Sequence, residues 1–204
     1  MSDRRDSRSS ARPIKRRRLL QVCCGLALAP PTVVRADEGE DALAPPQEND
    51  LLVFAFGQRA GQTIAADDVV MGARQVLAYP MSPATQQARN ATRLNQLIVV
   101  RVDPSLFAPE TLARAADGIV AYSGVCTHTG CDVTDWHGDA HRFKCPCHES
   151  EFDPSDGARV VGGPAPWQLA ALPLKIAGGA LVVAGSFEGR VGFAQPGFDP
   201  FGGV

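Results

Sequence analysis

The residues of this sequence best suited to chemistry are four cysteines and two histidines gathered between positions 126 and 148. They occur in two short runs, Cys-Thr-His-Thr-Gly-Cys at 126–131 and Cys-Pro-Cys-His at 145–148. In each run a single turn of backbone can direct a sulfur and a ring nitrogen into one small volume, and both atoms ligate transition metals. Packing in a hydrophobic core does not account for this concentration of ligands. The spacing predicts a metal centre.

Three kinds of site use such residues. A [2Fe–2S] cluster can be held by two cysteines on one iron and two histidines on the other. A structural zinc ion takes four ligands of these types, so it would leave two cysteines without a role. Two plain disulfides would leave both histidines without a role. We favour the iron–sulfur cluster, and we keep a zinc-stabilised interaction module as a distant alternative.

The two runs, together with Gly-Gly-Pro-Ala-Pro at 162–166, resemble the disulfide-containing Rieske proteins. This family includes the iron–sulfur subunit of quinol–cytochrome c oxidoreductases and the small subunit of arsenite oxidase. The similarity extends over residues 95–185. It implies one Rieske [2Fe–2S] cluster as the cofactor. It also implies an all-β fold of stacked antiparallel sheets, with a small cluster-binding subdomain and one short helix.

The resemblance assigns a role to each of the six residues. It implies iron ligands Cys126 and Cys145 on one iron, iron ligands His128 and His148 on the other, and a disulfide between Cys131 and Cys147. A persistent disulfide fits an oxidising compartment. Two neutral imidazoles replace two anionic thiolates, so the cluster accepts an electron more easily than an all-cysteine cluster does. The expected reduction potential lies between about −150 and +300 mV.

Four further positions bear on the potential and on the partner. Ser150 matches the family serine that donates a hydrogen bond to a bridging sulfide. Phe152 stands where high-potential members carry a tyrosine, so we expect a potential below the top of the range. Glu149 replaces the usual glycine after the ligand histidine, and Thr129 replaces the leucine typical of quinol-oxidising members.

These features lead to a functional prediction. The protein transfers one electron at a time as a periplasmic subunit of a redox complex, in the manner of the arsenite oxidase small subunit, and it is not a catalyst on its own. Its expected partner is a larger catalytic subunit or a c-type cytochrome. The alternative is the iron–sulfur subunit of a quinol–cytochrome c oxidoreductase, and only there would quinol be a partner.

Composition limits the remaining possibilities. The chain has 204 residues, of which 45% are hydrophobic and 21% charged, as in a soluble globular protein of one domain. It has no run of the ~20 apolar residues that a membrane helix needs, which excludes a polytopic membrane protein. From position 37 onward, 20 acidic residues face 11 basic ones. This negative balance argues against a nucleic-acid partner.

The elements that must position the metal ligands are short. Strands are expected at 51–56, 75–79, 96–102, 119–122, 172–176 and 180–184, which are rich in Val, Ile and Leu and bounded by Gly, Pro or Asp. One helix is expected at 109–116, because a proline opens it. The domain should span 51–204, with its cluster-binding part at 121–170. The final segment from 187 is expected to pack onto the domain's own sheet, and the alternative is a docking strap for a partner subunit.

The N-terminus carries the features of an export signal. Arg16-Arg17 precedes two leucines and a short apolar run, and a small-residue cleavage site follows, so residues 1–36 resemble a twin-arginine signal peptide. Such signals export folded proteins, which predicts a periplasmic location. The alternative is an uncleaved anchor in the inner membrane. Residues 37–50 are acidic and contain a proline pair, and they are predicted to be a flexible leader.

Overall fold

The fold of the described part of the chain is almost entirely β. The computed structural model describes residues 38–193, and the expected signal peptide lies outside the described residues. A seven-stranded sheet has the order β10-β11-β1-β2-β3-β4-β9, and a four-stranded sheet has the order β5-β6-β7-β8. All the pairings between these strands are antiparallel. The predicted all-β fold of antiparallel sheets is confirmed.

The strands of the larger sheet are β1 (Leu51–Phe54), β2 (Val76–Met81), β3 (Leu97–Arg101), β4 (Ile119–Ser123), β9 (Ala171–Leu172), β10 (Leu174–Ala177) and β11 (Ala180–Val183). The strands of the smaller sheet are β5 (Asp135–His137), β6 (Arg142–Lys144), β7 (Glu151–Asp153) and β8 (Arg159–Gly162). Two α-helices, α1 (Glu38–Leu43) and α2 (Pro109–Arg114), and four 3-10 turns accompany them; the turns are Ala66–Asp68, Arg93–Asn95, Pro104–Leu106 and Gly138–Ala140. None of the helices in residues 38–193 is long and apolar enough to span a membrane.

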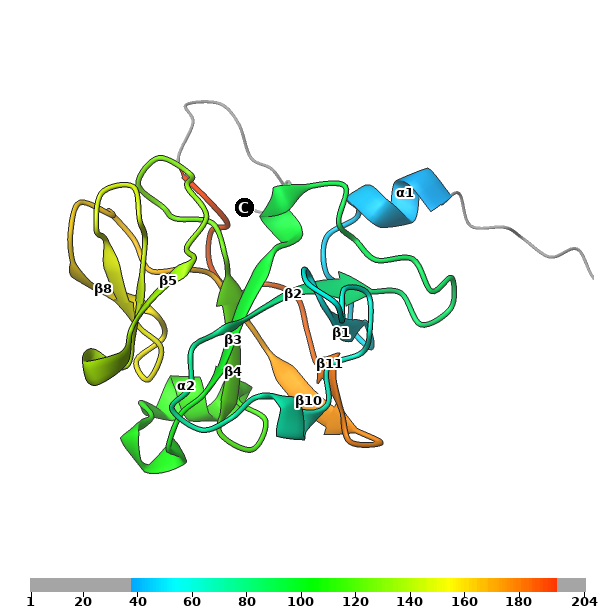
Figure 1. Cartoon of the computed structure of the whole chain (residues 1–204), viewed down its shortest axis with the longest axis horizontal. Coiled ribbons are helices and arrows are strands. Elements are labelled where there is room, and N and C mark those ends of the chain that lie inside the picture. The colour runs from blue at the N-terminus through cyan, green and yellow to red at the C-terminus, as the bar shows by residue number, and fades with distance from the viewer. Residues whose placement is uncertain (1–37, 194–204) are drawn as a thin grey trace, which may run out of the picture. The chain divides into compact units, whose positions relative to one another are not determined.

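Strands β3 and β4 separate two hydrophobic cores. Leu97 and Val99 of β3 face one core, whereas Ile98 and Val100 face the other. Successive side chains of a strand point to opposite faces, so a strand buried on both faces must be hydrophobic throughout, as β3 is. In Figure 1 these strands lie between the smaller sheet and strands β10 and β11. The core that contains Ile98 and Val100, the second core, also contains Phe143 and Phe152 of the smaller sheet.

Part of the predicted flexible leader is attached to the domain. The buried guanidinium of Arg89 donates to the buried carboxylate of Asp50 at 2.6 and 3.1 Å, and to the Asp41 side chain of α1 at 3.1 Å. A buried cation needs such partners, because an unpaired charge in the interior is costly. Residues 41–50 therefore pack against the segment after β2. The acidic composition suggested flexibility because the sequence does not show the distant arginine.

The last described residues pack on the domain, as expected for the segment from 187. Glu188 and Ala171 exchange two backbone hydrogen bonds of 2.8 and 2.9 Å, and Val191 is buried. The carboxylate of Glu188 also accepts from Arg114 of α2 at 2.9 Å. Residues 194–204 lie outside the described residues.

Candidate metal centre

Two loops of the same construction carry the six ligand-type residues. The first loop joins β4 to β5, and there the N–H of Cys126 donates to the carbonyl of Cys131 while its own carbonyl accepts from Gly130. The second joins β6 to β7, and Cys145 makes the same two bonds with Ser150 and Glu149. In both loops the fifth residue has a positive φ, +79° at Gly130 and +60° at Glu149. Each cysteine is thus held at the start of a closed turn.

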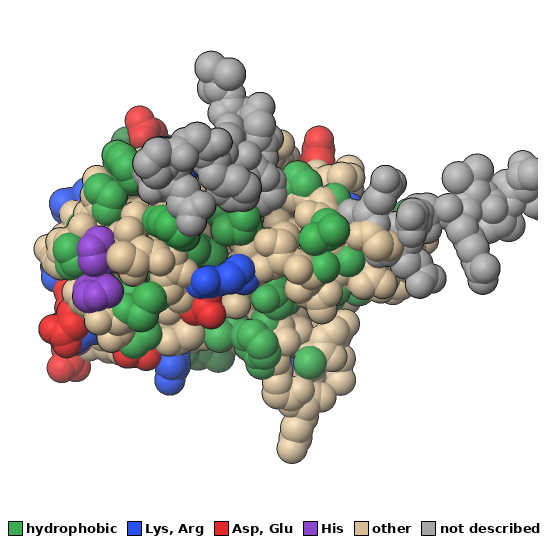
Figure 2. All heavy atoms as spheres, turned by 90° about the horizontal axis from the view of Figure 1, so that it is seen from above, with side chains coloured by type: hydrophobic (Ala, Val, Ile, Leu, Met, Phe, Trp, Pro, Cys, Tyr) green, Lys and Arg blue, Asp and Glu red, His purple; other side chains and the backbone are tan. Residues whose placement is uncertain are grey.

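The loops place the two thiols inside and the two imidazoles at the surface. Cys126 and Cys145 are unpaired thiols with about 1% of their surface exposed, and they belong to the core that contains Phe152. The Nδ1 atoms of His128 and His148 lie 3.2 Å apart, His148 is exposed and His128 is half-buried. Figure 2 shows two histidine side chains in contact on one face, beside hydrophobic side chains. The arrangement offers one buried ligand pair and one exposed ligand pair.

The predicted disulfide between Cys131 and Cys147 is present, with a Cα–Cα distance of 6.5 Å. It joins the first loop to the second: Cys131 lies three residues after His128, and Cys147 directly precedes His148. The sulfur of Cys145 lies within 4.8 Å of both disulfide sulfurs. Because a disulfide sulfur is no longer a thiolate, these three atoms do not form a metal site, and four residues remain as candidate ligands.

The four remaining residues fit a two-metal cluster better than a single zinc ion. Ligands of one tetrahedral zinc ion lie within 4 Å of one another, because each is about 2.0–2.3 Å from the metal. Among the described residues, no three of the four candidate atoms come within 4.8 Å of one another. Two sulfurs inside and two nitrogens outside, by contrast, form the donor set of a [2Fe–2S] cluster with one Cys₂ iron and one His₂ iron.

The free thiol of Cys126 keeps its proton until a metal binds. Burial raises its pKa to about 11, and the neighbouring Cys145 thiol adds to the rise. Hydrogen bonds from the His128 backbone and the Ser150 side chain act in the opposite direction. At neutral pH the free thiol is therefore protonated, and iron must displace the proton when it binds.

A third loop, between β8 and β9, is hydrogen-bonded to both ligand loops. The Ser150 hydroxyl accepts a hydrogen bond of 3.1 Å from the N–H of Ala165, and the Thr127 hydroxyl donates one of 2.6 Å to the Trp167 carbonyl. Ser150 and Thr127 are both buried. Thr127 is not among the residues predicted for the site, although it lies between the two predicted ligands Cys126 and His128. Phe152 lies beside the thiols in the second core, fully buried and without a hydroxyl.

Gly163 in this third loop leaves no room for a side chain. Its φ is +78°, and a Cβ there would lie 2.5 Å from the Cα of Ser150. We expect Gly163→Ala to lower the free energy of unfolding by about 3 kcal/mol and to weaken cluster retention, because backbone strain and overpacking add. Gly157→Ala is the matched control, since Gly157 has φ +61° with nothing within 4 Å of a Cβ. Chemical denaturation of both variants measures the difference; equal losses would show that the close approach at Gly163 is unimportant.

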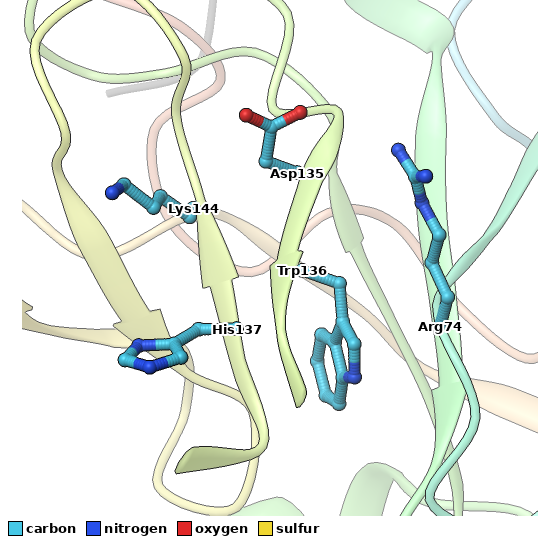
Figure 3. A pocket seen from close by; sticks show the side chains of 5 residues that line it. All are labelled: Arg74, Asp135, Trp136, His137 and Lys144. Carbon is cyan, nitrogen blue, oxygen red and sulfur yellow. The ribbon is translucent and has the colours of Figure 1, made fainter. Parts of the chain in front are cut away.

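A shallow hollow on the smaller sheet lies apart from the metal ligands. Its volume is about 350 Å³, and it is lined by Arg74, Asp135, Trp136, His137 and Lys144. Figure 3 shows Arg74 and Trp136 on one side, with His137 and Lys144 pointing away from them. The Arg74 guanidinium donates to the Thr134 carbonyl at 2.6 Å, and His137 pairs with Glu151 at 3.3 Å. These side chains stabilise the surface of the sheet, and none is a ligand candidate.

Comparisons with known proteins agree with the site. Residues 79–173 match the family model of the Rieske [2Fe-2S] domain. The cytochrome bc1 complex Rieske iron-sulfur subunit of Streptomyces lividans is 42% identical over 98 residues, which are 47% of this chain and 58% of that protein. A protein of Haloferax mediterranei, named as the proposed Rieske subunit of a respiratory nitrate reductase, is 47% identical over 76 residues, 37% of this chain and 34% of that protein.

Among solved structures, the soluble domain of Rieske protein II from Sulfolobus acidocaldarius superposes with a TM-score of 0.39 and 23% identity, over 52% of this chain and 69% of that one. The chain spans less than two thirds of the length of the curated relatives named above. The family match includes both ligand loops and the third loop that holds them. Residues 79–173 of this protein are therefore a Rieske [2Fe–2S] domain of the disulfide-containing type, the kind of domain that binds one [2Fe–2S] cluster.

Proposed function

We propose that the protein is the one-electron transfer subunit of a respiratory redox complex. The observation that carries the proposal is the pairing of His128 with His148 at the surface, above two buried cysteine thiols and beside a disulfide. When bound, a cluster with Cys₂ and His₂ ligation takes up or gives up a single electron. The buried thiols keep water from one end of the site. The histidine rings are the groups through which a docked partner would reach it.

Each residue set has a distinct role in this proposal. Cys126 and Cys145 would bind the inner iron, and His128 and His148 the outer iron. The ring nitrogens of the histidines that do not bind iron can hold or release a proton as the charge of the site changes, which couples electron transfer to proton transfer. The Ser150 hydroxyl, already held by Ala165, would donate its proton to a bridging sulfide.

We further propose that the complex is a periplasmic oxidase of the kind to which the arsenite oxidase small subunit belongs. Support comes from the twin-arginine-like segment at 1–36, from Phe152 in the place of a tyrosine, and from the exposed Thr129 in the place of a leucine. Thr129 lies beside His128 on the exposed part of the first loop, so it would contact whatever docks there. The iron–sulfur subunit of a quinol–cytochrome c oxidoreductase is the second candidate, because several relatives are named as the Rieske iron-sulfur subunit of a cytochrome bc1 complex.

Purification of the tagged full-length protein from its native host would test both the proposed electron transfer and the proposed kind of complex. Two irons and two acid-labile sulfides per chain, with a Rieske electron paramagnetic resonance signal, would support electron transfer through the cluster, whereas zinc without iron would refute it. Co-purification with a molybdenum-containing subunit from the soluble fraction would support the periplasmic oxidase. A b-type cytochrome from the membrane fraction would replace it with the quinol-oxidising complex and a retained N-terminal anchor.

Phe152→Tyr is expected to raise the reduction potential. A tyrosine hydroxyl at this buried position would donate a hydrogen bond to a ligand sulfur and withdraw negative charge, which favours the reduced cluster. One such bond of about 1 kcal/mol corresponds to roughly 40 mV for one electron. Redox titration followed by circular dichroism measures the shift. Phe152→Leu is the control for repacking, and a rise of the same size in both variants would contradict the hydrogen-bond explanation.

A further inference from the structure

Arg93 reaches the first ligand loop from a 3-10 turn that carries no metal ligand. Its Nη2 atom donates to the carbonyl of Gly130, and also to Oδ1 of Asp132 at 2.7 Å. These two residues flank Cys131, the first-loop partner in the disulfide, and Gly130 is two residues from His128. One side chain therefore binds the loop on both sides of its disulfide anchor.

Gly130 is also covered by the last described residues. A Cβ at Gly130 would lie 2.5 Å from Cδ1 of Phe193, so the phenyl ring lies directly against this glycine. The neighbouring Gly192 would bring a Cβ to 3.6 Å from Leu94, the residue after Arg93, and to 3.5 Å from Val125. The loop segment after His128 is thus contacted by both the Arg93 turn and the last described residues. Its position does not depend on the cluster alone.

The contact brings two opposite charges close to the site. The side chains of Arg93 and Asp132 are 52% and 44% exposed, so solvent screens them in part but not completely. Asp132 also acts on the half-buried Tyr79, whose pKa is raised chiefly by burial and next by the charge of Asp132, while the charge of Arg93 lowers it. The two charges are therefore felt by a side chain that is not bonded to either. Removing one of them would leave the other uncompensated beside the ligand loop.

We propose that Arg93 is a positioning residue of the metal centre and that the Arg93–Asp132 pair tunes its reduction potential. The inference rests on the proposed one-electron function. Arg93 restrains the loop through the Gly130 carbonyl, and its charge offsets that of Asp132. Reduction adds one negative charge to the cluster, so a cation nearby favours the reduced state and an anion disfavours it.

Charge-neutralising variants of the full chain give shifts of opposite sign. Arg93→Gln is expected to lower the equilibrium constant for one-electron reduction about threefold, and Asp132→Asn to raise it about threefold, each roughly 30 mV for one electron. The double variant should titrate near the wild type. Arg93→Lys keeps the charge but not the planar guanidinium, so it should restore most of the potential and only part of the stability of the loop.

Arg59→Gln is the matched control. Arg59 forms a half-exposed pair with Asp68 at 2.6 Å in the segment after β1, which contributes no residue to either ligand loop. Its removal should leave the potential unchanged. Shifts of Arg93→Gln and Asp132→Asn in the same direction, or no shift in either, would overturn the inference. A wild-type protein without a [2Fe–2S] signal would instead overturn the proposed function, so the two failures are distinguishable.

Discussion

His148→Ala is expected to abolish the Rieske electron paramagnetic resonance signal and to reduce bound iron at least tenfold. His148 is exposed at the tip of the second loop, and its ring lies against that of His128, the other proposed ligand of the outer iron. Loss of one imidazole leaves that iron with a single protein ligand. Binding energy at such sites is distributed over few ligands, so the incomplete site does not retain its cluster.

A second histidine provides the control for this result. His137 is also exposed and lies on β5 of the same sheet, where its ring contacts Glu151 at 3.3 Å. His137→Ala should keep full iron content and the wild-type signal. Iron analysis and low-temperature spectra of the two purified variants make the comparison. A normal signal in His148→Ala would show that the ligand assignment is wrong, and loss of the signal in both variants would indicate general destabilisation.

Replacing Cys131 and Cys147 together by serine is expected to cost about 3 kcal/mol of folding free energy. The disulfide closes a loop with a sequence separation of 16, and cross-links of this length remove roughly that amount of chain entropy from the unfolded state. For a domain of this size the melting temperature should fall by about 10 °C. The cluster should still assemble, because neither cysteine is a proposed iron ligand, but it should be lost faster and titrate at a shifted potential.

The wild-type protein under reducing conditions offers an independent version of the same experiment. Cys147 is exposed and Cys131 half-buried, so a strong thiol reductant can reach the bond. Decay of the visible absorbance of the cluster, followed with and without reductant, should accelerate to the rate of the double variant. If the double variant and the wild type lose the cluster at equal rates, the disulfide does not stabilise the loops.

The larger sheet was predictable from the sequence to a greater degree than the smaller one. β3 is hydrophobic at successive positions because both of its faces are buried, and the predicted strand at 96–102 contains it. The strands β5, β6 and β7 have only three residues each, with one aromatic side chain, half-buried in β5 and buried in β6 and β7, between two polar or charged ones. Such short segments carry too little periodicity to identify. Their pairing depends on the second core, which is formed from distant parts of the chain.

The metal centre, too, was predictable from the sequence only in part. The cysteine and histidine runs indicated the ligand types, and the resemblance to Rieske proteins predicted the disulfide that the structure contains. Two of the contacts that support these loops join residues 37 and 40 positions apart, Arg93 with Gly130 and Thr127 with Trp167. A single arginine or threonine has no local pattern that would single it out. Only the folded chain brings these side chains to the loops.

Because β3 and β4 belong to both cores, they also determine how the domain unfolds. The core that encloses the cysteine thiols cannot open without exposing one face of these strands, and the other core loses its own support when they leave. Melting of the two sheets is therefore coupled into one cooperative unit, and amide protons of β3 and β4 should exchange only through global unfolding. The site that carries the electron is thereby protected by the stability of the whole domain, not only by that of its own loops.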